Sequence, residues 1–301
     1  MINNMKKIIF TIFLFSGFIF AGGGSAPHLN GADLSILWVF PFAGILLSIA
    51  VCPLVAPHFW HQNFGKISAF WAILFIVPFL FKVGFTVTIY ELLHVGLLEY
   101  VPFIILLLAL FTISGGVQLT GALVGTPIIN TSIILIGTIL ASWMGTTGAA
   151  MLLIRPLIRA NKDRKNKVHV IVFFIFLVAN IGGSLTPLGD PPLFLGFLKG
   201  VNFFWTTSAM MVPMLFMAIS LLIIFFIFDT YLYKKENIKT VETEIKIGIE
   251  GSFNLLLLLG VIGSVLLSGF WKPHIEFEVF HVNVELQNVV RDILLLSLAF
   301  A

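Results

Sequence analysis

Charged residues are scarce in this sequence. Asp, Glu, Lys and Arg make up only 10% of the 301 residues, whereas 59% are hydrophobic and the mean hydropathy is +1.07. A soluble domain carries about 25% charged residues, because its surface must be hydrated. The apolar residues also form long blocks rather than the short alternation of an outer-membrane barrel. The sequence therefore predicts an all-α, polytopic membrane protein, since helices satisfy their own backbone hydrogen bonds in hydrocarbon.

Cysteine and enzyme motifs are also lacking. The one cysteine, Cys52, lies in an apolar run and can form no internal disulfide. A membrane enzyme such as a lipid-modifying transferase would carry a pair of acidic motifs or a Ser/His/Asp set. The sequence contains neither, so we expect no catalytic residues. The net charge is +3, but the basic residues gather in a few loops, which is typical of topology signals. We expect membrane lipid and small ions or a small organic anion as partners, and no nucleic acid.

The N-terminal segment, residues 1–26, is short for a membrane helix. Lys6 and Lys7 precede the apolar stretch 8–20, and small residues follow it. This stretch falls short of the ~20 residues that span a bilayer and is typical of a signal-peptide core. We expect a signal peptide, with a retained short membrane segment as the alternative.

The apolar blocks predict the membrane crossings. Continuous blocks cover 34–56, 70–90, 100–117, 208–231 and 253–271, and two longer blocks, 127–160 and 168–200, contain internal breaks. A last apolar run begins near Ile293 and is too short to cross a bilayer at ~1.5 Å rise per residue. We therefore expect the chain to stop inside an element.

The block 127–160 is too long for one crossing. As one helix it would measure about 51 Å, against ~30 Å of hydrocarbon. Thr126-Pro127 predicts a helix start, and Gly145-Thr146-Thr147-Gly148 predicts a break in the middle. The two short arms fit a re-entrant hairpin. A hairpin also keeps the basic clusters 155–167 and 234–246 cytoplasmic, whereas a spanning helix places both outside, against the positive-inside rule.

The second break lies in the block 168–200. Gly182-Gly183 predicts the end of a first half-helix, and Asp190-Pro191 predicts the N-cap and first residue of a second. Lipid does not tolerate irregular backbone, so this segment must line a cavity, as in transporters with discontinuous helices. Free carbonyls, hydroxyls and one carboxylate are hard oxygen ligands, which suit Na⁺ or a proton on the carboxylate.

The two breaks together form the candidate ion and substrate site. Its residues are Gly145, Thr146, Thr147, Gly148, Asn180, Gly182, Gly183, Ser184, Thr186, Pro187, Gly189 and Asp190. The oxygen candidates for Na⁺ are Thr146, Thr147, Ser184, Thr186 and Asp190. Two alternatives stay open: Asp190 can serve only as a helix cap, and the Thr146 and Thr147 hydroxyls can bond carbonyls one turn back. No cofactor is expected; Na⁺ and H⁺ would be transported or coupling ions.

Two further sets of polar residues receive a structural interpretation. The loop 272–292 contains His274, Glu276, Glu278 and His281, but their spacing matches no metal-ligand template, so we expect an exposed acidic loop. Arg155 is expected to reach the cytoplasmic interface rather than a substrate.

The sequence of the two breaks resembles the ion transporter superfamily. This superfamily includes NhaD-type sodium/proton antiporters, arsenite exporters, citrate–metal carriers and dicarboxylate/sodium symporters. The resemblance is carried by Asn180-Ile-Gly-Gly-Ser-Leu-Thr-Pro-Leu-Gly-Asp-Pro-Pro192, which looks like the antiporter form, and by Gly145-Thr-Thr-Gly-Ala-Ala-Met-Leu-Leu-Ile-Arg-Pro156. Dicarboxylate symporters carry Ser-Asn-Thr at the hairpin tip, where this chain has Met144-Gly145-Thr146.

The resemblance implies an inverted-repeat transporter, in which each repeat supplies a re-entrant hairpin and a discontinuous helix. We expect the first repeat over 34–233, a cytoplasmic loop over 234–252 and the start of a second repeat over 253–301, with the rest of that C-terminal repeat missing. The expected function is a sodium/proton antiporter of the cell inner membrane. The alternative is an ion-coupled transporter of citrate or a similar organic anion, and a homodimer stays open.

Overall fold

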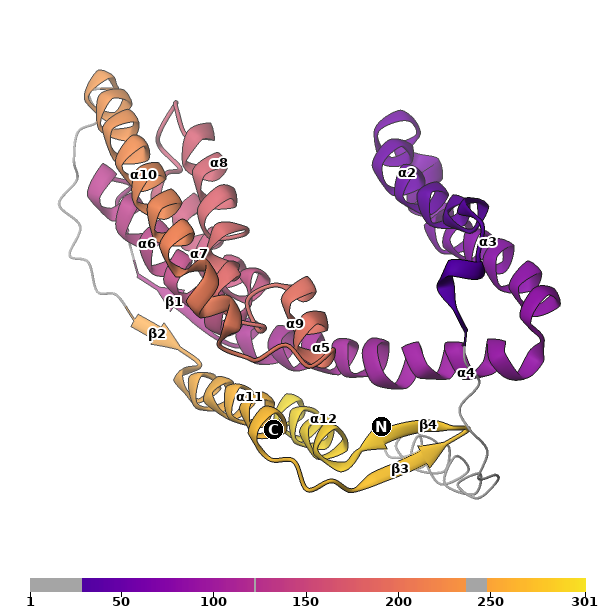
Figure 1. Cartoon of the computed structure of the whole chain (residues 1–301). Coiled ribbons are helices and arrows are strands. Elements are labelled where there is room, and N and C mark those ends of the chain that lie inside the picture. Colours follow the sequence, from indigo (N-terminus) through magenta and orange to yellow (C-terminus); the bar gives the residue numbers. More distant parts are fainter. Residues whose placement is uncertain (1–28, 122, 237–247) are drawn as a thin grey trace, which may run out of the picture. The chain divides into compact units, whose positions relative to one another are not determined.

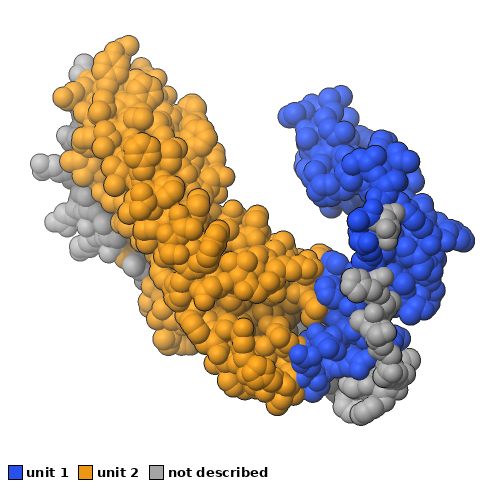
Figure 2. All heavy atoms as spheres, viewed as in Figure 1, with its two compact units in different colours: residues 1–97, 276–284 blue, residues 98–275, 285–301 orange. Residues whose placement is uncertain are grey.

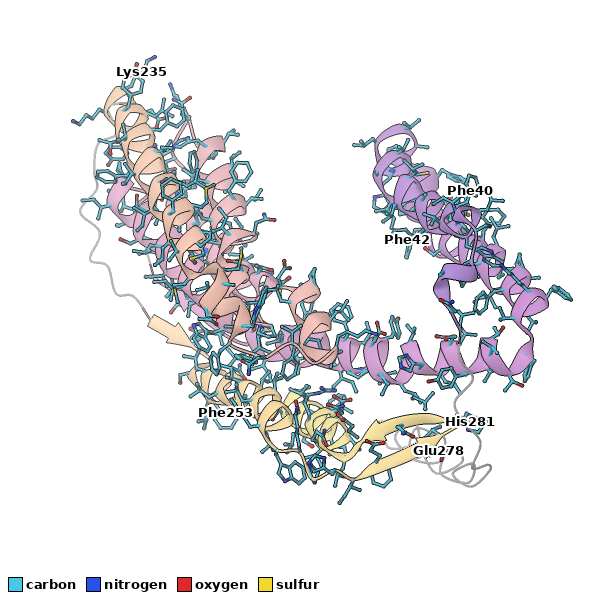
Figure 3. The ribbon with its side chains drawn as sticks, viewed as in Figure 1. Phe40, Phe42, Lys235, Phe253, Glu278 and His281 are labelled. Atoms are coloured by element: carbon cyan, nitrogen blue, oxygen red, sulfur yellow. The ribbon has the colours of Figure 1, made fainter. Side chains whose placement is uncertain are left out.

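The computed structural model describes residues 29–121, 123–236 and 248–301. The predicted signal segment 1–26 and most of the predicted loop 234–252 lie outside these ranges. Within them, seven helical stretches are long and apolar enough to cross a membrane. Apolar side chains such as Phe40, Phe42 and Phe253 stand out from these helices and are exposed (Figure 3). The chain is an all-α, polytopic membrane protein, as its composition predicts.

The chain divides into two compact units (Figure 2). Unit 1 contains Met1–Leu97 and Glu276–Val284, and unit 2 contains Leu98–Ile275 and Glu285–Ala301. The elements that begin in unit 1 are η2 (Gly31–Asp33), η3 (Ile36–Val39), α2 (Phe40–Val55), α3 (Pro57–Val83), α4 (Phe85–Val95), η4 (Gly96–Tyr100), β3 (Glu276–Val279) and β4 (Val282–Glu285). In this unit α2 packs against α3, where the Trp71 indole nitrogen donates a 3.0 Å hydrogen bond to the Ser48 hydroxyl.

The predicted crossings 70–90 and 100–117 differ in their bounds from the helices of the structure. Helix α3 begins at Pro57, and Gly84, with φ of +88°, separates it from α4. The stretch Phe85–Gly115 is then helical throughout, with a π-helical turn at Gly96–Tyr100. Residues 91–99, between the two predicted crossings, therefore lie in helix, including the acidic Glu91 and Glu99. The backbone is interrupted by a left-handed glycine, which a hydropathy pattern does not locate.

The loop 272–292, expected to be an exposed acidic loop, has Glu276 and Glu278 exposed and also contains regular structure. It contains the β3–β4 ribbon, in which His281 Nδ1 lies 3.2 Å from Glu278 Oε1 (Figure 3). In the described ranges no three His, Cys, Asp or Glu side chains are placed to hold a metal ion.

Unit 2 contains the helices around both breaks (Figure 1). Its elements are α5 (Val101–Gly115), β1 (Gln118–Thr120), α6 (Pro127–Met144), α7 (Thr146–Ala160), α8 (Val168–Leu177), η5 (Ile181–Leu185), α9 (Pro191–Leu198), α10 (Trp205–Lys235), β2 (Gly248–Glu250), α11 (Ser252–Phe270) and α12 (Leu286–Ala299). Helix α10 packs on α6, α8 and η5, whereas α11 and α12 pack on α5. The core between them is apolar and includes the buried side chains of Ile134, Phe174 and Phe225. Strands β1 and β2 pair antiparallel, with Leu119 opposite Ile249.

Helices α6 and α7 form a hairpin. Thr126 caps α6 by accepting a 3.3 Å hydrogen bond from the Ile129 amide, and Gly145, with φ of +80°, forms the tip. At the base, the Gly125 amide donates a 2.9 Å hydrogen bond to the Ala160 carbonyl. The two arms measure about 27 Å and 22 Å at ~1.5 Å per residue. The chain therefore enters and leaves the hairpin at the same end.

The first half of the broken helix ends earlier than predicted. Helix α8 stops at Leu177, rather than at Gly182-Gly183, and the Asn180 side-chain amide donates to the Ile175 carbonyl at 2.8 Å. Neither glycine has positive φ, so neither supplies a left-handed cap. Gly182 instead allows close packing, because a Cβ there would lie 2.6 Å from the Thr138 carbonyl oxygen. Helix α12 starts at Leu286, before the apolar run near Ile293. Its first turns are polar, so the apolar run alone does not mark where the helix begins.

Candidate ion and substrate site

The tip of the hairpin is hydrogen-bonded to the interrupted segment between α8 and α9. The Thr146 amide donates a 3.0 Å hydrogen bond to the Gly189 carbonyl. The Thr186 hydroxyl donates to the Ser142 carbonyl, and the Ser142 hydroxyl donates to the Gly182 carbonyl. These bonds use backbone groups that a helix end leaves without partners. The two breaks that the sequence indicates therefore meet at one place.

Glycines make this approach sterically feasible. A Cβ on Gly189 would lie 2.1 Å from the Gly183 carbonyl oxygen, and a Cβ on Gly183 would lie 2.5 Å from Thr146 Cγ2. Both distances are far inside van der Waals contact. A larger residue at Gly183 would push the hairpin away from the break, and one at Gly189 would push apart two turns within the interrupted segment. The role of these two glycines is close backbone packing.

A cavity of about 40 Å³ lies at this junction. At ~10–15 Å³ per water position it has room for about three waters, or for one small ion or carboxylate. Apolar side chains of α5 and α9, including Leu110 and Phe194, form the rest of its wall. The residues from the predicted set that line it are Gly145, Thr146, Thr147, Gly148, Pro187, Gly189 and Asp190.

The other predicted residues do not line the cavity. Asn180 bonds the end of α8, and the Ser184 hydroxyl donates to the Ile181 carbonyl at 2.8 Å. Gly182 and Gly183 are buried in packing contacts. Thr186 is buried, and its hydroxyl both donates to the Ser142 carbonyl and accepts from the Leu188 amide at 3.3 Å. In this arrangement Thr186 joins the two segments.

The start of α9 offers a carboxylate but few hydrogen-bond donors. Pro191 and Pro192 have no N–H group, and the Leu193 and Phe194 amides both bond the Asp190 carbonyl. Asp190 occupies the N-cap position, yet its carboxylate makes no capping hydrogen bond, and the residue is exposed. The cap-only interpretation of Asp190 therefore lacks its hydrogen bond, and the carboxylate is available to a cation.

The start of α7 has the opposite character. The amides of Thr147 and Gly148 lie in its first turn, where an α-helix leaves N–H groups without helical partners and carries the positive end of its dipole. Among the described residues, neither the Thr146 nor the Thr147 hydroxyl has a hydrogen-bond partner. Arg155, farther along α7, is exposed and does not line the cavity. One side of the cavity thus suits an anion, and the other suits a cation.

A buried polar cluster holds the base of the hairpin, and the sequence reasoning missed it. Asp229 of α10 lies 2.6 Å from Arg164 Nη2 and 2.7 Å from His169 Nε2, and it accepts a 3.0 Å hydrogen bond from the Asn130 amide. Asn130, on the first arm, also exchanges hydrogen bonds with Asn161, which follows the second arm at the same base. A carboxylate inside the apolar block 208–231 is the signal that could have revealed this cluster. None of these residues lines the tip cavity, so the cluster positions the hairpin.

An ion-sized cavity between a helical hairpin and an interrupted helix is the arrangement found in secondary transporters, where irregular backbone at membrane depth lines a binding site. The family comparison agrees with that class. Residues 31–301 match the model of a family described as "Putative citrate transport", and the chain belongs to this family. No curated protein and no solved structure matches the chain. The match supports the citrate-transporter-like form of the resemblance, and the NhaD-type form stays a prediction.

Proposed function

We propose that this protein is an ion-coupled transporter of citrate or a similar organic anion. The observation that carries the proposal is membership of the citrate-transport family over residues 31–301. The geometry of the tip cavity supports it, because the cavity offers donors for an anion and a carboxylate for a cation. Its volume suits one carboxylate group of a larger anion rather than the whole molecule.

In the proposed site, each ion has its own ligands. A carboxylate of the anion accepts hydrogen bonds from the Thr147 and Gly148 amides at the start of α7, as anions do at helix N-termini. Na⁺ or H⁺ binds the Asp190 carboxylate, with the Thr146 and Thr147 hydroxyls as further oxygen ligands for Na⁺.

Asp190 then couples the two ions. An ionised Asp190 repels a carboxylate about 5 Å away by ~3 kcal/mol at an effective dielectric constant of ~20. That repulsion lowers the affinity for the anion by about two orders of magnitude. A cation or proton on Asp190 removes the repulsion, so the anion binds tightly only when the coupling ion is present. Coupling of this kind is reciprocal, and each ion raises the affinity for the other.

The test is uptake of labelled citrate into proteoliposomes that contain the full-length protein, with and without Na⁺ and pH gradients. Wild-type protein should accumulate citrate when one gradient is imposed. Asp190→Asn should lose gradient-driven accumulation but keep citrate exchange, because the neutral amide no longer repels the anion. Asp163→Asn, an exposed residue in the loop after α7, is the matched control and should behave as wild type. Absence of citrate uptake and exchange in the wild type would contradict the proposal.

Sodium/proton antiport is the second candidate. The observation in its favour is the Asp190 carboxylate, which makes no capping hydrogen bond and lines the cavity. Thr146 and Thr147 line the same cavity, and their hydroxyls have no hydrogen-bond partner among the described residues. Gly145 at the tip, where dicarboxylate symporters have Asn, also removes one polar group that would contact an anion. Na⁺-dependent dissipation of a pH gradient in everted vesicles, without citrate, separates this function from the first. Under this candidate, Asp190→Asn abolishes the exchange and added citrate has no effect.

A further inference from the structure

A larger cavity lies in unit 2 between α5, α7 and β1 (Figure 1). It measures about 290 Å³ and shares no lining residue with the tip cavity. At ~10–15 Å³ per water position it has room for about twenty waters, which is more than a phosphate group needs. None of its lining residues is acidic, and the polar ones are Ser114, Gln118, Arg155 and Arg159. The cavity is therefore cationic.

Two arginines of α7 give the cavity its charge. Arg155 and Arg159 are four residues apart, so they lie on the same face of the helix. Both are exposed, and both line the cavity. The Arg159 guanidinium donates a 3.2 Å hydrogen bond to the Leu119 carbonyl, which holds it beside β1. In the described ranges Arg155 has neither an ion pair nor a hydrogen bond, so its guanidinium is available to a ligand.

No described carboxylate neutralises this pair. Glu250 of β2 lies opposite Gln118 in the β1–β2 ladder, yet it forms no ion pair with either arginine among the residues that the structure describes. Two like charges at this spacing on a helix repel each other, and an anion placed between them relieves that repulsion. The planar guanidinium of arginine matches the oxygens of a phosphate, which it can bind through two parallel hydrogen bonds.

An exposed apolar stripe of α5 leads into the same cavity. Ile104, Leu108, Phe111 and Gly115 follow one another at intervals of three or four residues, which places them on one face of the helix. All four are exposed, and Gly115 lines the cavity. The stripe is about 17 Å long at ~1.5 Å rise per residue, close to the ~15 Å that one leaflet contributes to the hydrocarbon core. A small soluble anion would use none of this surface, whereas a phospholipid would use both the stripe and the arginines.

We propose that this cavity binds an anionic phospholipid of the surrounding bilayer. Its phosphate lies between Arg155 and Arg159, and one acyl chain lies along the exposed stripe of α5. A zwitterionic lipid fits less well, because its choline group would bring another cation beside the two arginines. On the expected topology the base of the hairpin is cytoplasmic, so the lipid belongs to the leaflet whose anionic headgroups attract basic residues. The site is separate from the tip cavity and does not depend on the transport proposed above.

The test is native mass spectrometry of the delipidated full-length protein in detergent. The protein is titrated with phosphatidylglycerol and with phosphatidylcholine of the same acyl chains. Wild-type protein should bind its first phosphatidylglycerol about thirtyfold more tightly than phosphatidylcholine, which is the value of two basic residues at an anionic membrane surface. The double substitution Arg155→Gln and Arg159→Gln should lower the affinity for phosphatidylglycerol to that for phosphatidylcholine.

The matched control removes the same charge from the neighbouring loop. Lys162 and Lys165 are exposed, follow α7 and do not line the cavity. The double substitution Lys162→Gln and Lys165→Gln should therefore keep the preference for phosphatidylglycerol. Equal loss in the two double variants would show a diffuse basic surface and overturn the proposal, as would an unchanged preference in the arginine variant or no preference in the wild type.

A third arm separates a lipid from a soluble phosphate. Glycerol 3-phosphate carries the phosphate without acyl chains, so at millimolar concentration it should not displace phosphatidylglycerol. Displacement would identify the site as one for a soluble anion and overturn the lipid assignment. If the arginine double variant fails to fold because the bond to Leu119 is lost, Arg155→Gln decides alone, since Arg155 has no described partner to lose. It should weaken phosphatidylglycerol binding about fivefold, and an unchanged affinity would contradict the proposal.

Discussion

The Thr146 amide donates a 3.0 Å hydrogen bond to the Gly189 carbonyl, and this bond joins the tip of the α6–α7 hairpin to the interrupted segment before α9. Both groups belong to the backbone, so the contact does not depend on the side chain at either position. It does depend on the absence of side chains at the neighbouring glycines. The geometry of the tip cavity therefore rests on backbone packing, which makes it sensitive to small additions of volume.

Gly189→Ala should disrupt the tip cavity. The new methyl group would lie 2.1 Å from the Gly183 carbonyl oxygen, and relief of this overlap must move Gly189, whose carbonyl accepts the hydrogen bond from the Thr146 amide. We expect a loss of ~1–3 kcal/mol in stability, typical of overpacking, and a loss of citrate uptake of more than tenfold. The measurements are thermal unfolding in detergent and proteoliposome uptake.

Gly196→Ala, in the adjacent helix α9, is the matched control for that substitution. Its Cβ would lie 3.9 Å from the nearest atom, Val201 Cγ2, and alanine is the better helix former. Uptake should stay at the wild-type level. Equal behaviour of the two alanine variants would contradict the packing argument.

Asp229→Asn should destabilise the hairpin base. The substitution removes the 2.6 Å ion pair of the buried Arg164 and leaves it only the longer contact with Glu236, at 3.7 Å. Breaking a buried ion pair typically costs ~3–5 kcal/mol. Thermal unfolding should shift strongly, and protease accessibility of the loop between α7 and α8 should rise. Glu99→Gln removes an ion pair with the half-exposed Lys199 and should cost at most ~1 kcal/mol. If the two variants unfold at the same temperature, the cluster does not anchor the hairpin.

Thr186→Val should loosen the hairpin tip without changing ion dependence. It leaves the Ser142 carbonyl and the Leu188 amide without their buried partner, at a cost of ~1–3 kcal/mol. Hydrogen exchange of the 142–148 amides should accelerate. Thr186→Ser keeps the hydroxyl and should restore protection. A higher Na⁺ concentration for half-maximal uptake in Thr186→Val, restored to the wild-type value in Thr186→Ser, would instead favour the prediction that Thr186 is a Na⁺ ligand.

The breaks at Gly145 and after α8 could be predicted from the sequence, because block length and the positions of glycine and proline indicate them. A 34-residue apolar block exceeds the membrane thickness, and glycine and proline mark where a helix can stop. The residue at which α8 ends could not be predicted from the sequence, because Gly182 and Gly183 can serve either as a helix cap or as packing contacts. Only the position of Thr138 in the neighbouring helix decides between them.

The hydrogen-bond partners of the polar side chains also could not be predicted from the sequence, because the partners lie far apart along the chain. Asn130 and Asp229 are 99 residues apart in the chain, and Ser142 and Thr186 are 44 apart. From the sequence alone, a hydroxyl in a glycine-rich break indicates an ion ligand. The sequence does not show whether that hydroxyl already donates to a carbonyl of a distant residue. Thr146 and Thr147 line the cavity, whereas Thr186 does not.

The paired prolines at the start of α9 disfavour a continuous helix through this segment. Without N–H groups at Pro191 and Pro192, a helix running from η5 into α9 would lack two of its backbone hydrogen bonds. Local refolding of the segment into one helix is therefore a costly way to open and close the site. In the proposed transporter, a movement that carries α8, η5 and α9 together as one preformed unit avoids that cost.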